Sequence, residues 1–182
     1  MIGLRAMLAA AGVSSGVPTI WHNDRNLDKV YELSTADLSV VRSAASPTAE
    51  PFGIGGDLSK IWHNEDVTDK IYELSTSDFS TVRSAASPSA EPTGVGGDST
   101  TIWHNDNSLD KIYELAIADF SVVRSAASPS TSPWGIGGDS TTIWHNDNNL
   151  DKIYELSTTD LSVVRSAAAP STTLRGVGGD ST

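Results

Sequence analysis

The chain has 182 residues, of which 38% are hydrophobic and 19% charged, a balance typical of folded domains and unlike that of disordered acidic tails. Its net charge of −11 argues against binding to nucleic acid or to anionic membranes, because those partners need clustered lysine and arginine. It has no cysteine, which excludes disulfides and thiolate metal sites.

Residues 1–12 read MIGLRAMLAAAG, with one arginine ahead of a few apolar residues. This stretch is too short and too weakly apolar for a clear secretory signal, and no apolar run approaches the roughly 18 residues that span a bilayer. We therefore expect an N-terminal arm over residues 1–12 and a soluble protein whose location the sequence does not identify. Residues 13–182 are predicted to form one repeat domain.

The repeat domain is built on a constant spacing of 41 residues, the separation of Trp21 from Trp62, and no insertion or deletion interrupts it. It divides into units near 13–51, 52–92, 93–133 and 134–174, and residues 175–182 repeat the start of a unit. Copies this similar must all dock on their neighbours in the same way. The constant spacing is seen in three residue types: Trp21, Trp62, Trp103 and Trp144; Tyr31, Tyr72, Tyr113 and Tyr154; Arg42, Arg83, Arg124 and Arg165.

Each unit has the pattern of four short strands. In the fullest copy they are expected at 134–139, 141–147, 151–158 and 161–168, because β-branched and aromatic residues dominate them and turn residues separate them. Four antiparallel strands in a unit of this length are typical of a propeller blade. We therefore predict an all-β protein, a β-propeller with about four blades per chain. The repeated glycine pairs are placed on the innermost strands, where blades crowd together; a β-solenoid or a helical repeat fits the pattern less well.

The stretch PWGIGGDSTTIWHNDNNLDKIYELS, residues 133–157, resembles the NHL-type propeller repeat and is similar to YWTD repeats. The resemblance lies in Pro133, Gly135, Ile136, Asp139, Asp147, Lys152 and Ile153, whereas His145 departs from both patterns. It implies a propeller fold and does not select a substrate.

The two ends of the repeat domain suggest how the ring closes. Residues 175–182 match the inner strand of a further unit, whereas in residues 12–16 only Gly12 and Val13 keep the same pattern. The C-terminal copy is therefore expected to lie beside strand 19–24. Two arrangements remain open: a closed four-bladed monomer, or a homodimer in which two chains share one eight-bladed ring.

The repeated aromatic residues are interpreted first as packing residues. A tryptophan buries about 150–250 Å², and both faces of a blade are covered by neighbours, so the four repeated tryptophans are expected between blades. Trp134 occurs once, at the position of Phe52, Thr93 and Arg175, and is the candidate for ligand contact. An aromatic shelf for sugars is the alternative use of such residues.

The same interblade role is expected for the chain's histidines: His22, His63, His104 and His145. Imidazole is a good zinc or copper ligand, but these residues lie on the second strand of each blade, too far apart to share one ion. A buried histidine bonded to an acid, a serine or a carbonyl is the simpler interpretation.

The turn after the second strand offers weak metal candidates. Asp147, Asn149 and Asp151 place oxygen donors at alternate positions, which suits calcium, but asparagine and aspartate are also the residues that tight turns require. We expect no cofactor and no confident metal ligand.

The functional prediction follows from the likeness of the blades. Catalytic sites need unlike residues in one place, so no catalytic residue is assigned and a non-enzymatic scaffold or interaction module with equivalent loop sites is expected. Its partner would be a protein or a carbohydrate. The alternatives are a lactonase-like or lyase-like enzyme with a divalent cation at the channel, and a glycan-binding lectin.

Overall fold

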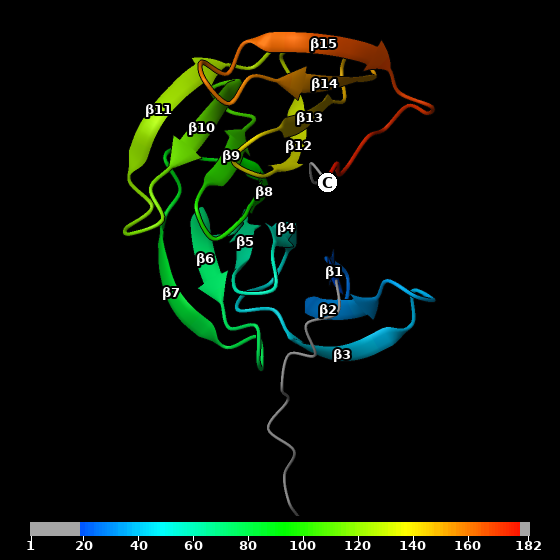
Figure 1. Ribbon diagram of the computed structural model, residues 1–182. Helices are drawn as coiled ribbons and strands as arrows, with labels where there is room; N and C mark the ends of the chain where they lie inside the picture. The colour runs from blue at the N-terminus through cyan, green and yellow to red at the C-terminus, as the bar shows by residue number, and fades with distance from the viewer. Residues whose placement is uncertain (1–18, 179–182) are drawn as a thin grey trace, which may run out of the picture.

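The computed structural model describes residues 19–178, which form antiparallel β-sheets joined by turns (Figure 1). The strands in chain order are β1 Thr19–Asp24, β2 Lys29–Ser34, β3 Val40–Ala45, β4 Pro51–Gly56, β5 Ile61–Glu65, β6 Lys70–Leu74, β7 Thr81–Ala86, β8 Pro92–Gly97, β9 Ile102–Asp106, β10 Lys111–Leu115, β11 Val122–Ala127, β12 Pro133–Gly138, β13 Ile143–Asp147, β14 Lys152–Leu156 and β15 Val163–Ala168. No helix capable of crossing a membrane occurs within this range.

The strands form four blades, each a simple meander. Blade A is β1–β3, blade B is β4–β7, blade C is β8–β11 and blade D is β12–β15. Figure 1 shows them around an arc that is open between blades A and D, with the first strand of blades B, C and D toward the centre. The predicted all-β propeller fold is confirmed.

Turn chemistry sets where the strands end. In blade D, the Asp139 carboxylate accepts hydrogen bonds from the amides of Thr141 and Thr142 at 2.7 and 2.9 Å, so β13 begins later than expected, at Ile143. The amide of Leu161 bonds to the carbonyl of Ser157 at 2.9 Å, which ends β14 at Leu156 instead of residue 158.

Blade A differs from the others at its inner edge. β1 pairs with β2, and over residues 19–178 no inner strand pairs with its other edge. The degraded inner-strand pattern at 12–16 lies outside the described residues. At the other end of the arc, residues 175–178 run beside β12. The described part of the C-terminal copy does not pair with β1 in this structure.

Glycine is required on the inner strands because neighbouring backbones touch there. A Cβ added to Gly94 on β8 would lie 2.3 Å from Oδ1 of Asn105 and 2.8 Å from the carbonyl oxygen of Trp134 on β12. No side chain fits at such distances, so the glycine pattern fixes the spacing of the blades.

The hydrophobic core consists of three equivalent clusters, one at each joint between blades. At the joint of blades B and C, Trp62 packs edge-on against Phe120 with ring centroids 5.9 Å apart. The Trp62 indole also donates a hydrogen bond to the Asp98 carbonyl of blade C at 3.0 Å. Phe120 has φ 62°, a left-handed backbone that bulky residues adopt only when packing compensates for it.

At each joint, an arginine of one blade donates hydrogen bonds to carbonyl groups of the next blade. Arg83 of blade B donates to Glu73 of its own blade at 2.6 Å and to the carbonyls of Ile117 and Ala118 in blade C. Its guanidinium carbon lies 4.6 Å from the centroid of the Phe120 ring. Arg83 therefore contacts two blades at once.

The inner-strand crowding gives a direct stability test. We expect Gly94→Ala to lower the free energy of unfolding by about 1–3 kcal/mol, because the new methyl group overlaps Asn105 and β12 and forces the blades apart. Urea denaturation followed by tryptophan fluorescence measures the change. Ser171→Ala, on the exposed linker, is the control, and equal stability of the two variants would contradict the proposed crowding.

Candidate functional site

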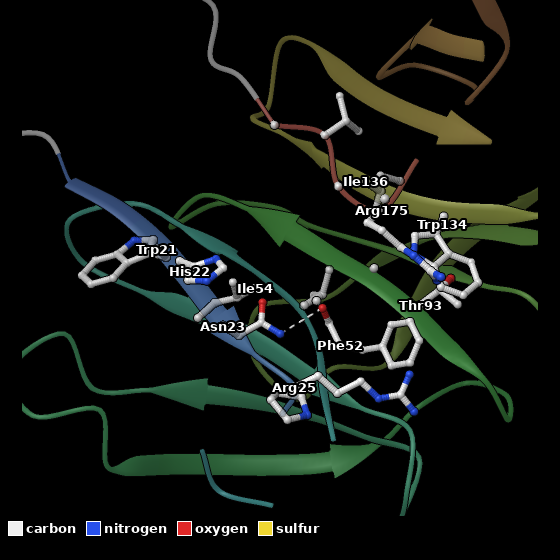
Figure 2. Close-up of a pocket in the computed structure, with 18 of the residues that line it drawn as sticks. Trp21, His22, Asn23, Arg25, Phe52, Ile54, Thr93, Trp134, Ile136 and Arg175 are labelled. Atoms are coloured by element: carbon white, nitrogen blue, oxygen red, sulfur yellow. Dashed lines mark hydrogen bonds between the residues drawn. The ribbon is translucent and has the colours of Figure 1, made fainter. Parts of the chain in front are cut away.

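A cavity of about 680 Å³ lies at the centre of the arc (Figure 2). β1 forms one wall, and the inner strands β4, β8 and β12 together with residues 175–178 form the rest. The titratable side chains that line it are His22, Arg25 and Arg175, and no carboxylate belongs to the described lining. The cavity therefore carries positive charge in a chain whose net charge is −11.

The cavity gathers the positions at which the repeats differ most. Phe52, Thr93, Trp134 and Arg175 occupy the same place in successive units, the residue after the one that begins each inner strand. Because all inner strands face the centre, these unlike side chains converge although each comes from a different repeat (Figure 2). The site is thus asymmetric in an otherwise repetitive molecule.

The converging side chains form a chain of ring and cation contacts. The rings of Phe52 and Trp134 meet edge to face, with centroids 5.3 Å apart. The Arg175 guanidinium carbon lies 4.3 Å from the Trp134 centroid, a cation–π distance. Thr93 is buried beneath them and donates to the Pro133 carbonyl at 2.9 Å.

A second arginine extends this arrangement from the turn after β1. The Arg25 guanidinium carbon lies 4.7 Å from the Phe52 centroid, and the same side chain forms an ion pair with Glu50. In the other repeats its place is taken by Asp66, Asn107 and Asn148. Across the part of the chain that the structure describes, Arg175 has no carboxylate partner, so its charge remains available to a ligand.

The β1 wall carries two residues expected to pack between blades. Trp21 is half-buried and meets Phe79 of blade B edge-on, with centroids 5.9 Å apart. His22 is exposed and faces the cavity, because the described part of blade A has no inner strand on the free edge of β1. Asn23 links this wall to blade B by donating to the Phe52 carbonyl at 3.1 Å (Figure 2).

The other three histidines are buried structural residues. Nδ1 of His104 lies 2.8 Å from the Gly94 carbonyl oxygen, so this nitrogen carries the proton and donates. Nε2 then accepts from the hydroxyl of Ser87 on the linker, at 3.1 Å. His63 and His145 repeat both contacts, at 3.0 and 3.1 Å to a carbonyl and 3.2 and 3.3 Å to a serine. Each histidine thus ties its blade's inner strand to the preceding linker.

The environments of the remaining repeated tryptophans follow their positions in the arc. Trp62 and Trp103 are buried at joints, and each indole donates to an aspartate carbonyl of the next blade, at 3.0 and 2.9 Å. Trp144 is half-buried on the outer face of blade D, where the described structure has no following blade.

The predicted metal candidates form a turn. One carboxylate oxygen of Asp147 accepts from the amides of Asn149 and Leu150, both at 2.9 Å, and the other accepts from the amide of Ser132 at 3.0 Å. The Asn149 side chain points to Thr131, and Asp151 has φ 50° at the turn's end. These contacts occupy both carboxylate oxygens of Asp147. Within residues 19–178, no three histidine or acidic side chains converge.

The sequence contains the signal for this cavity only in part. Trp134 is identified by its departure from the repeat, and Arg25 and Arg175 depart from it in the same way. The sequence does not reveal their convergence, because it depends on the second residues of the inner strands facing a shared centre, which is a property of the ring and not of one unit.

Known protein structures share this architecture. The chain superposes on a streptogramin B lyase with a TM-score of 0.61 at 19% identity, covering 92% of this chain and 57% of that one. It superposes on glutaminyl cyclase of Myxococcus xanthus with a TM-score of 0.70 at 12% identity, covering 87% and 75% of the two chains. For a chain of a nidogen/laminin complex the TM-score is 0.69 at 16% identity, with 88% and 63% covered.

These likenesses establish the β-propeller fold alone, because so few residues are identical in each pair. The chain spans little more than half the length of the streptogramin B lyase that it matches. No protein-family model and no curated protein matches the sequence.

The buried histidines predict a pH dependence of stability. Burial lowers the pKa of His63, His104 and His145 to about 4 from an ordinary value near 6.5. Between these values the unfolded chain binds more protons than the folded chain, so the free energy of unfolding falls as the pH falls. At pH 5 we expect a loss of about 2 kcal/mol per histidine relative to neutral pH.

Urea denaturation at pH 7.5, 6 and 5 measures this loss. His104→Gln keeps a donor and an acceptor but removes one titrating group, so it should reduce the pH dependence by about a third. Equal stability of the parent chain at pH 7.5 and 5 would contradict the buried, neutral state of these residues.

Proposed function

We propose that the chain is a non-enzymatic propeller interaction module, and that its ligand binds in the central cavity. One observation carries this proposal: the repeats are nearly identical at their joints yet differ at the positions of Phe52, Thr93, Trp134 and Arg175, which meet in the cavity. Packing alone would favour the same residue in each copy. Unlike residues in one place instead provide the asymmetry that selective binding needs.

The chemistry of the cavity favours a planar, negatively charged group. Trp134 and Phe52 offer aromatic faces, and Arg175 lies against Trp134 with no carboxylate partner in the described structure. A guanidinium forms paired hydrogen bonds with a carboxylate, and the adjacent rings can stack on a flat skeleton. An aromatic carboxylate, free or as part of a partner molecule, fits this combination.

The lining supports binding more than catalysis. Its titratable groups are two permanently charged arginines and one histidine, which is not a matched acid–base pair. In the turn after β13, both carboxylate oxygens of Asp147 accept internal hydrogen bonds. The NHL-like and YWTD-like repeat pattern supports a propeller fold and does not select the ligand.

Titration calorimetry with 2-naphthoate and with its neutral amide, 2-naphthamide, tests the proposal. We expect the carboxylate to bind at least about tenfold more tightly, because only it makes charge-assisted hydrogen bonds with Arg175. Arg175→Gln should reduce naphthoate affinity to the level of the amide. Trp134→Thr, which installs the residue found at position 93, should weaken both ligands.

Lys29→Gln removes an exposed cation outside the cavity and is the control for net charge. Equal affinity for the acid and the amide, or unchanged binding by Arg175→Gln, would contradict the proposal. Asn149→Ala tests the equivalent turns, and a fractional loss of binding there would favour repeated loop sites. Tryptophan quenching by sugars would favour a lectin, and lactone hydrolysis dependent on a divalent cation would favour an enzyme.

A further inference from the structure

Within residues 19–178 there are three copies of one joint, and blades A and D carry the two halves of a fourth. At each joint the earlier blade supplies a tryptophan and an arginine, here called the covering face. The later blade supplies an inner strand and a left-handed apolar residue, here called the receiving face. The three apolar residues covered in this way are Phe79, Phe120 and Leu161.

Blade D presents an unused covering face. The Arg165 side chain is 72% exposed, against 29% and 30% for Arg83 and Arg124. Arg83 and Arg124 each reach two carbonyls of the following blade, whereas the structure pairs Arg165 with Glu155 of its own blade. Trp144 is half-buried, although Trp62 and Trp103 at complete joints are buried.

Blade A presents an unused receiving face. Leu38 has φ 60° and is 64% exposed, whereas Phe79, Phe120 and Leu161 share its left-handed backbone and are buried. Ile20 is 39% exposed, although its three equivalents are completely buried. Among the described residues, blade A thus carries the backbone strain of a joint without the covering that compensates for it.

Residues 175–178 lie against β12, in the place that the inner strand of a further blade would take. A Cβ on Gly135 of β12 would lie 2.8 Å from the Val177 amide nitrogen, just as a Cβ on Gly94 would lie 2.9 Å from that of Ile136. The segment therefore lies against β12 as β12 lies against β8. A Cβ on Gly176 would meet nothing within 4 Å, so the side of the segment that a further blade would cover is open.

We infer that blade D of one copy docks on blade A of a second copy, and that residues 175–178 complete the second copy's blade A as its inner strand. The pairing of β4 with β5 gives the register of this contact, because every unit repeats it. Val177 of one copy lies opposite His22 of the other, as Ile54 lies opposite His63 within one chain. Trp144 of the first copy then covers Leu38 of the second. Arg165 of the first copy reaches the turn at residues 35–36 of the second, as Arg42 reaches the carbonyls of residues 76 and 77 within one chain.

A second copy fits this place better than the chain's own blade A. Within one chain, β1 and residues 175–178 are separate walls of the central cavity and are not paired, and blades A and D are separated by the opening of the arc (Figure 1). A partner's β1 can reach the segment without moving it from β12. If blade D of each chain docks on blade A of the other, two chains of four blades each close as one eight-bladed ring. This inference does not depend on the ligand of the cavity.

Light scattering on a size-exclusion column, over a range of concentrations, tests the inference with the whole chain. We expect a mass of twice 19.1 kDa. Gly176→Val should raise the dimer dissociation constant by more than about tenfold, because the joint leaves no room for a side chain. At complete joints, a Cβ on Gly53 or Gly135 would lie 2.4 or 2.7 Å from an asparagine oxygen.

Gly176→Val is suited to this test because its side chain enters open space in a single chain, so folding should be preserved. Ser171→Val on the exposed linker is the matched control and should remain dimeric. Leu38→Ser is a second variant, on the opposite face, and should also weaken the dimer because Leu38 loses the contact with Trp144.

Single cysteines distinguish a shared ring from a ring closed within one chain, since the parent has no cysteine. A mixture of His22→Cys and Val177→Cys chains should form a disulfide-linked heterodimer under mild oxidation. The inference is overturned if the parent chain is a monomer at all concentrations, if Gly176→Val dimerises as the parent does, or if the mixture does not cross-link. Open-ended growth to larger masses would overturn the two-chain ring.

Discussion

The tryptophan that each blade places over the left-handed apolar residue of the next is the contact on which the structure depends. Phe120 holds a backbone conformation that costs free energy, and Trp62 and Arg83 from the preceding blade compensate for it. A single blade would expose both its strained turn and an apolar face. Stability therefore resides in the joints, as in other repeat proteins whose units contact only their neighbours.

The joints and the cavity place opposite demands on the same repeat. Joint residues must be alike, because every blade meets its neighbour through the same glycine, tryptophan and arginine contacts. The second residue of the inner strand points away from the joint and into the shared centre. Phe52, Thr93, Trp134 and Arg175 can therefore differ without disturbing the packing, and recognition is separated from stability within one strand.

Much of the fold is predictable from the sequence because one unit repeats its own information. Strand order, blade size and the glycine-rich inner strands follow from alternation, turn residues and the constant spacing of the repeats. Strand ends are less predictable, since they depend on capping bonds such as those of Asp139. The roles of individual histidines depend on burial: His104 is buried against Gly94, whereas His22 has the same sequence context and is exposed. The cavity is predictable only as a set of departures from the repeat, because its walls come from five separated segments.

The interchangeability of the joints has a consequence for how such a protein changes over time. Every covering face has the chemistry of every other, and so does every receiving face. Unequal recombination that adds or deletes one whole unit therefore leaves all contacts between surviving blades intact. The number of blades in a chain is free to drift by duplication, while the curvature at each joint decides how many blades make a ring.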